Sequence, residues 1–187
     1  MATKIILIHG NGGGTGSDNW QPYIQYELTK LGIETLSPNF PDPVTARSEY
    51  WLPFIESLGT DEDTIIVGHS SGAVAGMRYA ETHKLLGLVL VGACYTDLGY
   101  EEEKESGYYD APRDWEAIKD NTQWIIQFAS TDDPWISKEE PRYIAEHLNT
   151  EYHEYTDRGH FSGGGGHAPV LEFPELLAEI KAKLNIS

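Results

Sequence analysis

Positively charged residues are scarce in this 187-residue chain. Lysine and arginine together number 13, against 30 aspartates and glutamates, so the formal net charge is −17 with histidines neutral. Proteins bind nucleic-acid backbones and anionic lipid surfaces mainly through lysine and arginine. We therefore expect neither a nucleic acid nor a membrane among the partners of this protein.

Cysteine is nearly absent, because Cys94 is the only one in the chain. A lone cysteine can form no internal disulfide and cannot supply a multi-thiolate zinc site. Such usage is typical of reducing compartments. The sequence also lacks any run near the ~18 apolar residues of a membrane helix, and its N-terminal apolar stretch is too short for a signal peptide. We expect a cytoplasmic protein.

Apolar residues are nevertheless plentiful enough for a sizeable core, at 40% of the sequence. This composition and length predict one folded domain spanning 1–187. Six short apolar runs recur, and most are continuous, which is typical of strands buried on both faces of a parallel sheet. They lie at about 4–8, 33–36, 64–67, 87–92, 124–128 and 151–155.

The segments between these runs have helical periodicity. One example is the set Trp51, Phe54, Ile55 and Leu58, which share one helix face. Gly32 and Gly59 are placed as helix C-terminal caps, and 137–140 has the pattern of a capping box. Alternating strands and helices predict an α/β fold with a mainly parallel sheet and helices on both faces. Ligands of such sheets bind at the carboxyl ends of the strands.

The most specific motif is Gly68-His69-Ser70-Ser71-Gly72, which follows an apolar run and opens a helix of small residues. This is the G-x-S-x-G turn in its strand–turn–helix context, where the serine is a nucleophile. Glycines are needed because the turn is strained and tightly packed. We expect Ser70 to lie exposed above the sheet.

A serine hydroxyl needs a general base and a carboxylate that orients it. His160 follows the last predicted strand and is the favoured base, with His167 behind four glycines as the rival. Asp132 and Asp133 follow the fifth strand, and Asp133 is favoured because Pro134 restrains the turn beside it.

Two backbone N–H groups are needed to stabilise a tetrahedral oxyanion. We expect one from Ser71 and the other from Asn11 or Gly12 in the glycine-rich loop after the first strand. That loop does not match a dinucleotide or phosphate-binding motif, and no metal-ligand spacing occurs, so we predict neither a metal nor any other cofactor.

The acidic, tyrosine-rich segment 95–111 follows the fourth predicted strand, where hydrolases of this architecture often carry a lid. Two interpretations stand for this segment: a solvated acidic loop, or a short lid that is too small for a cap domain. If it is a lid, we expect Tyr100, Tyr108 and Tyr109 to line the substrate pocket.

Together these residues resemble the retinoblastoma-binding protein nine family of small serine hydrolases. Besides the Ser70 motif, the resemblance rests on the stretches 39–43, 51–54, 77–83 and 130–134, and it covers nearly the whole chain. It implies a compact α/β-hydrolase fold with a six-stranded sheet and no large cap domain. By position, the resemblance implies Ser70 as nucleophile, Asp133 as acid and His160 as base.

Two stretches depart from that family. The Leu-x-Cys-x-Glu motif for a pocket protein has threonine at its cysteine position, Thr60, so this partner is not expected here. The glycines at 163–166 lengthen the loop behind His160. We predict a metal-free serine hydrolase that acts on an ester, thioester or amide carbonyl of a small molecule or peptide. The alternative is a catalytically weak hydrolase fold that serves as a protein-interaction module.

Overall fold

The computed structural model describes residues 3–186 and contains one sheet of six parallel strands. The strand order is β2-β1-β3-β4-β5-β6, and each neighbouring pair is parallel. The strands are β1 (Lys4–Ile8), β2 (Glu34–Leu36), β3 (Thr64–His69), β4 (Gly87–Val91), β5 (Ile125–Ser130) and β6 (Glu151–Tyr155). Each predicted apolar run therefore forms a strand, which confirms the predicted sheet.

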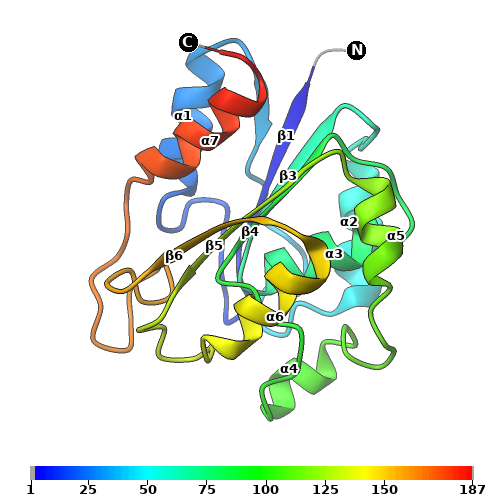
Figure 1. Ribbon diagram of the computed structural model, residues 1–187, viewed down its shortest axis with the longest axis vertical. Coiled ribbons are helices and arrows are strands. Elements are labelled where there is room, and N and C mark those ends of the chain that lie inside the picture. The colour runs from blue at the N-terminus through cyan, green and yellow to red at the C-terminus, as the bar shows by residue number, and fades with distance from the viewer. Residues whose placement is uncertain (1–2, 187) are drawn as a thin grey trace.

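Helices cover both faces of the sheet (Figure 1). They are α1 (Gln21–Lys30), α2 (Ser48–Ser57), α3 (Ser71–Ala80), α4 (Glu101–Glu105), α5 (Trp115–Asn121), α6 (Glu139–Leu148) and α7 (Pro174–Lys183). Their lengths reach ten residues at most within 3–186, too short to traverse a bilayer.

The core is divided by the sheet into two clusters, because successive strand residues point to opposite faces. Ile6 and Ile8 of β1 pack in the cluster that contains residues of α2, α3, α5 and α6. Ile5 and Leu7 pack in the cluster that contains residues of α1 and α7. Both faces of the central strands are thus fully buried, as their continuous apolar runs indicate.

The helix ends agree with the sequence in part. Gly32 and Gly59 adopt φ values of +79° and +71° directly after the ends of α1 and α2, so both are the predicted C-terminal caps. The predicted capping box at 137–140 is wrong, because α6 starts after Lys138 without a side-chain cap. The Glu140 carboxylate instead accepts hydrogen bonds from the backbone N–H groups of Tyr95 and Thr96, which follow β4.

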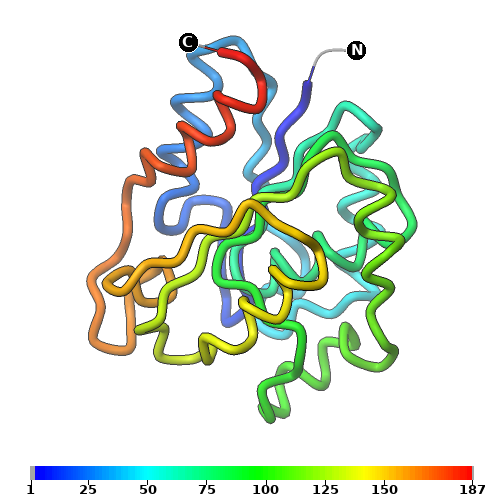
Figure 2. The backbone as a smooth tube through the Cα atoms, viewed as in Figure 1, coloured from blue at the N-terminus to red at the C-terminus, as the bar shows by residue number. Residues whose placement is uncertain are grey.

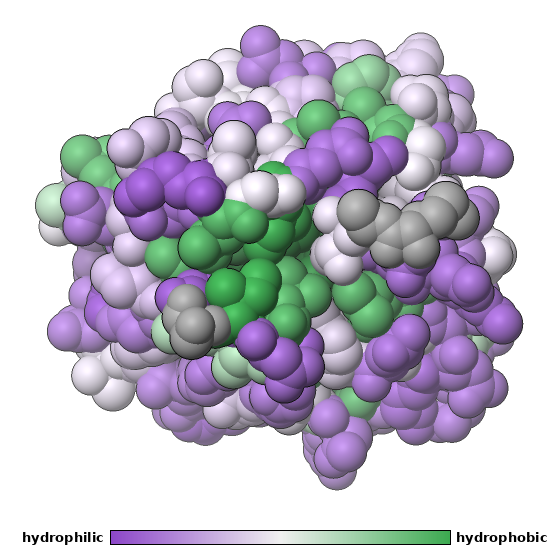
Figure 3. Space-filling view, turned by 90° about the horizontal axis from the view of Figure 1, so that it is seen from above, coloured by the Kyte–Doolittle hydropathy of each residue, from purple (hydrophilic) through white to green (hydrophobic). Residues whose placement is uncertain are grey.

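The two ends of the sheet differ in character. β1 begins and α7 finishes at one end of the molecule, and α4 lies at the opposite end (Figure 2). Seen from above, the end away from α4 has apolar side chains gathered in its middle and hydrophilic residues around them (Figure 3). The polar residues discussed below lie at the other end, where the strands terminate.

Candidate active site

Ser70 lies in the sharp turn between β3 and α3, with φ 55° and ψ −121°. This backbone conformation is strained for a residue with a side chain. The flanking glycines allow it, because a Cβ on Gly68 would lie 2.3 Å from the carbonyl oxygen of Gly72. A Cβ on Gly72 would lie 2.4 Å from that of Ile8. The strand–turn–helix context expected for the motif is therefore present.

His160 and Asp133 form a buried hydrogen bond at the same edge of the sheet. Nδ1 of His160 lies 2.6 Å from Oδ2 of Asp133, and their side chains are 8% and 4% exposed. The other carboxylate oxygen of Asp133 accepts the backbone N–H groups of Trp135 and Ile136 at 2.9 and 3.0 Å. This carboxylate is therefore held rigidly against the imidazole.

Ser70 and His160 line one cavity. Beneath the imidazole lies Gly92, where a Cβ would approach the ring to 3.1 Å. Within residues 3–186 the Ser70 hydroxyl makes no hydrogen bond, so it is available to a ligand. The serine–base contact is often long in hydrolases without substrate.

The rival residues Asp132 and His167 meet each other rather than the Asp133–His160 pair. Nδ1 of His167 lies 3.8 Å from Oδ2 of Asp132. The other Asp132 oxygen accepts the Ser130 hydroxyl and the N–H of Gly159. Asp132 therefore joins the end of β5 to the loop that carries His160.

The glycine-rich loop after β1 approaches Ser70 from the other side. Within residues 3–186 the N–H groups of Asn11 and Ser71 donate to no protein acceptor, as an oxyanion site requires. The N–H of Gly12 is already engaged, since it donates to the carbonyl oxygen of Val44 at 3.0 Å. This bond argues against the expectation that Gly12 is the donor.

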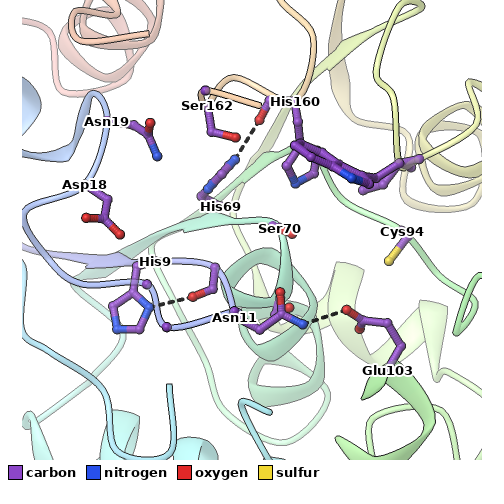
Figure 4. Close-up of a pocket in the computed structure, with 18 of the residues that line it drawn as sticks. His9, Asn11, Asp18, Asn19, His69, Ser70, Cys94, Glu103, His160 and Ser162 are labelled. Carbon is purple, nitrogen blue, oxygen red and sulfur yellow. Dashed lines mark hydrogen bonds between the residues drawn. The ribbon is translucent and has the colours of Figure 1, made fainter. Parts of the chain in front are cut away.

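Two buried histidines support the site, a role that their positions in the sequence do not indicate. Nε2 of His69 donates to the carbonyl oxygen of His160 at 2.7 Å (Figure 4), and burial lowers the pKa of His69 to about 3. Nδ1 of His9 donates to the carbonyl oxygen of Gly10, while its Nε2 accepts the N–H of Phe40. Burial also lowers the pKa of His9. Both rings are therefore neutral, and their hydrogen bonds hold the loops around Ser70 in place.

The cavity has a volume of about 640 Å³. Its acidic groups are Asp18 and Glu103, and no lysine or arginine among residues 3–186 lines it. Figure 4 shows the side chain of Asn11 pointing to Glu103, to which it donates a 2.8 Å hydrogen bond. The Glu103 carboxyl comes from α4, inside the predicted lid segment, and burial raises its pKa.

The three tyrosines predicted to line the substrate pocket have different positions. Tyr100 lines the cavity and is 46% exposed. Tyr108 is buried in the core, so its prediction is wrong. Its carbonyl oxygen accepts a 2.7 Å hydrogen bond from Nε of Arg78. Tyr109 is not among the residues that line this cavity. Its hydroxyl contacts Cys94 and Glu103, which do line it.

The glycine segment 163–166 packs against the loop that carries Asp133. A Cβ on Gly164 would lie 2.8 Å from the Trp135 ring, and one on Gly165 would lie 2.3 Å from Pro134. Three of these glycines adopt positive φ values. The segment therefore forms a close-fitting wall beside the cavity, which Gly163 also lines.

A metal site needs several ligating side chains close together. Residues 3–186 contain no group of three or more His, Cys, Asp or Glu side chains arranged to hold a metal ion.

A protein-family model described as serine hydrolase matches residues 5–179. The chain is 46% identical over 186 residues to the serine hydrolase RBBP9 of Rattus norvegicus, a match that covers 98% of this chain and 96% of that protein. It is 25% identical over 170 residues to the putative hydrolase YdeN of Bacillus subtilis (strain 168), covering 86% and 87% of the two chains. The family resemblance found in the sequence is thereby confirmed.

Solved structures share the fold. The crystal structure of the ydeN gene product from B. subtilis superposes with a TM-score of 0.86 at 22% identity, covering 98% of this chain and 100% of that one. Est1E from Butyrivibrio proteoclasticus, bound to ferulic acid, gives a TM-score of 0.72 at 14% identity, with 98% and 88% coverage. At these identities the likeness shows the α/β-hydrolase fold alone.

Proposed function

This chain belongs to the serine hydrolase family, and we propose that it cleaves an ester, thioester or amide through Ser70, His160 and Asp133. The substrate is a small molecule or peptide with a reactive carbonyl. The observation that carries the proposal is the 2.6 Å bond between His160 and Asp133 at a cavity lined by Ser70. This geometry provides a nucleophile, a base and a group that orients the base.

In the first half-reaction, Nε2 of His160 takes the proton of the Ser70 hydroxyl while Oγ attacks the carbonyl carbon. Asp133 holds the proton on Nδ1, which keeps Nε2 free to accept, and it stabilises the imidazolium that forms. The N–H groups of Asn11 and Ser71 bind the developing oxyanion. His160 then returns the proton to the leaving group, and Ser70 is left acylated.

In the second half-reaction, water attacks the acyl-enzyme. His160 removes a proton from the water, the same N–H groups bind the second oxyanion, and His160 returns the proton to Ser70 Oγ as the acid product departs. No step of this sequence calls for a metal or another cofactor.

The single-domain organisation, with a short lid at 95–111, is part of the proposal. Support for the lid comes from α4, whose Glu103 lines the cavity and binds Asn11. A cytoplasmic location is also proposed, on the basis of the lone and buried Cys94. We propose no nucleic-acid, membrane or pocket-protein partner. Thr60 occupies the position of the cysteine in the Leu-x-Cys-x-Glu motif, and its hydroxyl forms a hydrogen bond with the hydroxyl of Tyr79.

The test is covalent labelling by a fluorophosphonate probe, read by intact mass. We expect one adduct per wild-type chain and none on Ser70→Ala or His160→Ala, with His167→Ala as the matched control that still reacts. Circular dichroism must show that each variant is folded. A pre-steady-state burst of p-nitrophenol from p-nitrophenyl acetate would then demonstrate the acyl-enzyme.

Two results would overturn the proposal. A folded wild-type protein that takes no adduct would favour the protein-interaction module, since binding does not need the Ser70 hydroxyl. Labelling that persists in Ser70→Ala would assign the reactive group to another residue.

A further inference from the structure

A second cavity, of about 510 Å³, lies beyond Tyr109. It is formed by the loop after β4, the segment 109–115, Arg78 of α3 and Tyr143 of α6. Tyr109 lines it, while the Tyr109 hydroxyl contacts Cys94 and Glu103, which line the cavity that holds Ser70. The two cavities are therefore separated by little more than one side chain.

Arg113 is one of the residues that line this second cavity, and its guanidinium is buried. Its side chain is 3% exposed, and none of its three nitrogens has a hydrogen-bond partner in residues 3–186. Its charged neighbour is Glu81, whose Oε1 lies 3.8 Å from Nη1 of Arg113. That distance is too long for a hydrogen bond.

Glu81 is already committed to another arginine. Nη1 of Arg78 donates to both Glu81 oxygens, at 2.9 and 3.1 Å. The remaining Arg78 donors bind backbone carbonyls of the segment 108–112. The half-buried Arg78 thus takes up the Glu81 carboxylate, and the buried guanidinium of Arg113 keeps a positive charge without a hydrogen-bond acceptor in residues 3–186.

A charge in this position is costly to a folded protein. Burial and the repulsion of Arg78 lower the pKa of Arg113 to about 10. Replacing a buried, poorly paired charge by an apolar residue of similar volume often stabilises a protein. Stability alone therefore does not account for an arginine here, although a bound anion would, since it would supply the missing acceptors.

We propose that this second cavity binds a small organic monocarboxylate, with Arg113 as the residue that holds the carboxylate. Guanidinium groups bind carboxylates through two parallel hydrogen bonds. Aromatic rings also line the cavity. The rings of Tyr95 and Tyr143 stack with their centroids 4.1 Å apart, and the centroids of the Trp115 and Tyr143 rings are 5.9 Å apart. These rings fit an aromatic or otherwise apolar body on the ligand.

The other charged residues that line the cavity are Arg78, which is paired with Glu81, and two aspartates, so we expect a ligand with a single negative charge. Asp97 and Asp110 line the same cavity, half-buried and exposed, respectively. They repel a dianion such as phosphate more strongly than a monoanion.

Binding requires a small side-chain movement. The Arg113 nitrogens are shielded from solvent, and the guanidinium carbon lies 5.8 Å from the centre of the Trp115 ring. The proposal therefore requires that one of these two side chains rotates, and side-chain rotations are common on binding. The Trp115 indole is therefore a natural reporter for the test.

The test is titration of the ¹⁵N-labelled protein with 2-naphthoate, followed by assigned amide and indole resonances. We expect shifts at Thr96, Ala111 and the Trp115 indole, and a dissociation constant of about 1 mM or below. Neutral 2-naphthamide and inorganic phosphate should bind at least about tenfold more weakly. Shifts confined to Gly10, Gly12 and Ser71 would overturn the proposal, since they would place the ligand beside Ser70.

The decisive variant is Arg113→Met, with Lys119→Met as the control. Lys119 lies on α5 and pairs with the exposed Glu116, so this control removes the same charge outside the cavity. We expect Arg113→Met to weaken 2-naphthoate binding about tenfold or more while keeping the wild-type melting temperature or raising it. Lys119→Met should bind as the wild type does.

Unchanged binding by Arg113→Met would overturn the proposal. So would a large fall in its melting temperature without ligand, because Arg113 would then be a structural partner of Glu81. None of these measurements depends on hydrolytic activity, so the outcome is separate from that of the labelling experiment.

Discussion

The side-chain amide of Asn11 donates a 2.8 Å hydrogen bond to the Glu103 carboxyl, 92 residues later in the chain. The bond joins the loop after β1 to helix α4, and both residues line the cavity that holds Ser70. Tyr109 donates to the other oxygen of Glu103 at 3.3 Å. The loop that we propose to stabilise the oxyanion is thus held in part by the proposed lid.

This link predicts that Glu103→Ala lowers kcat for p-nitrophenyl acetate about tenfold, because Asn11 loses the acceptor that positions its loop. Glu103→Gln should stay within about threefold of the wild type, since its carbonyl oxygen can still accept from Asn11. Steady-state kinetics measure both. Equal activity of Glu103→Ala and wild type would mean that the loop is positioned without α4.

The two adjacent aspartates should differ sharply in their effect on turnover. Asp133→Asn should reduce kcat by about three to four orders of magnitude, because the amide no longer holds the proton on Nδ1 of His160. Asp132→Asn should cost far less, since its amide oxygen can still accept from Ser130 and Gly159. The reverse order of effects in steady-state assays would make Asp132 the acid.

The glycine after the Ser70–Ser71 pair should be intolerant of any side chain. Gly72→Ala places a Cβ against two carbonyl oxygens of the β1 end, and we expect it to lower the free energy of unfolding by about 2–3 kcal/mol. Gly99→Ala is the control, since it has open space at φ +78° and should cost about 1 kcal/mol. Urea denaturation compares the two. A smaller loss for Gly72→Ala than for Gly99→Ala would contradict the crowding argument.

The buried His69 should destabilise the protein in mild acid. Its pKa is about 3 in the folded state and about 6.5 in the unfolded state. Between these two values His69 is therefore protonated in the unfolded chain and neutral in the folded chain. The contribution of neutral His69 to the free energy of unfolding is fully present above pH ~6.5. It is lost as the pH falls toward 3, at about 1 kcal/mol per pH unit.

Urea denaturation between about pH 7 and about pH 5 measures this dependence. In His69→Gln the free energy of unfolding should fall less steeply with acid, by about 1 kcal/mol per pH unit. His9 acts in the same direction in both proteins. Equal slopes for the two proteins would mean that His69 is protonated in the fold.

The charge of the cavity should bias it against anionic substrates. Asp18 and Glu103 line it, no lysine or arginine of the described part of the chain does, and the formal net charge of the whole chain is −17. We expect kcat/KM for p-nitrophenyl hydrogen succinate to be about tenfold below that for p-nitrophenyl butyrate at low salt. Added salt and Glu103→Gln should each narrow the gap. A preference for the anionic ester would contradict this electrostatic argument.

Local patterns in the sequence were sufficient for the sheet and for the turn around Ser70. Continuous apolar runs, such as the one ending at Val67, predict buried strands because both faces of a parallel sheet are covered. Gly68 and Gly72 indicate a crowded turn because only glycine fits there. These properties depend on neighbours in the chain, so the sequence displays them directly.

Contacts between distant segments were decided by the tertiary structure. Three features depend on how loops from separate strands converge. They are the hydrogen bond between Asn11 and Glu103, the pairing of His160 with Asp133 rather than Asp132, and the burial of Tyr108. Arg113 looks like an ordinary surface arginine in the sequence, and only packing removes it from water. Burial and long-range pairing arise when the whole chain is folded, and side-chain chemistry changes with the environment they create.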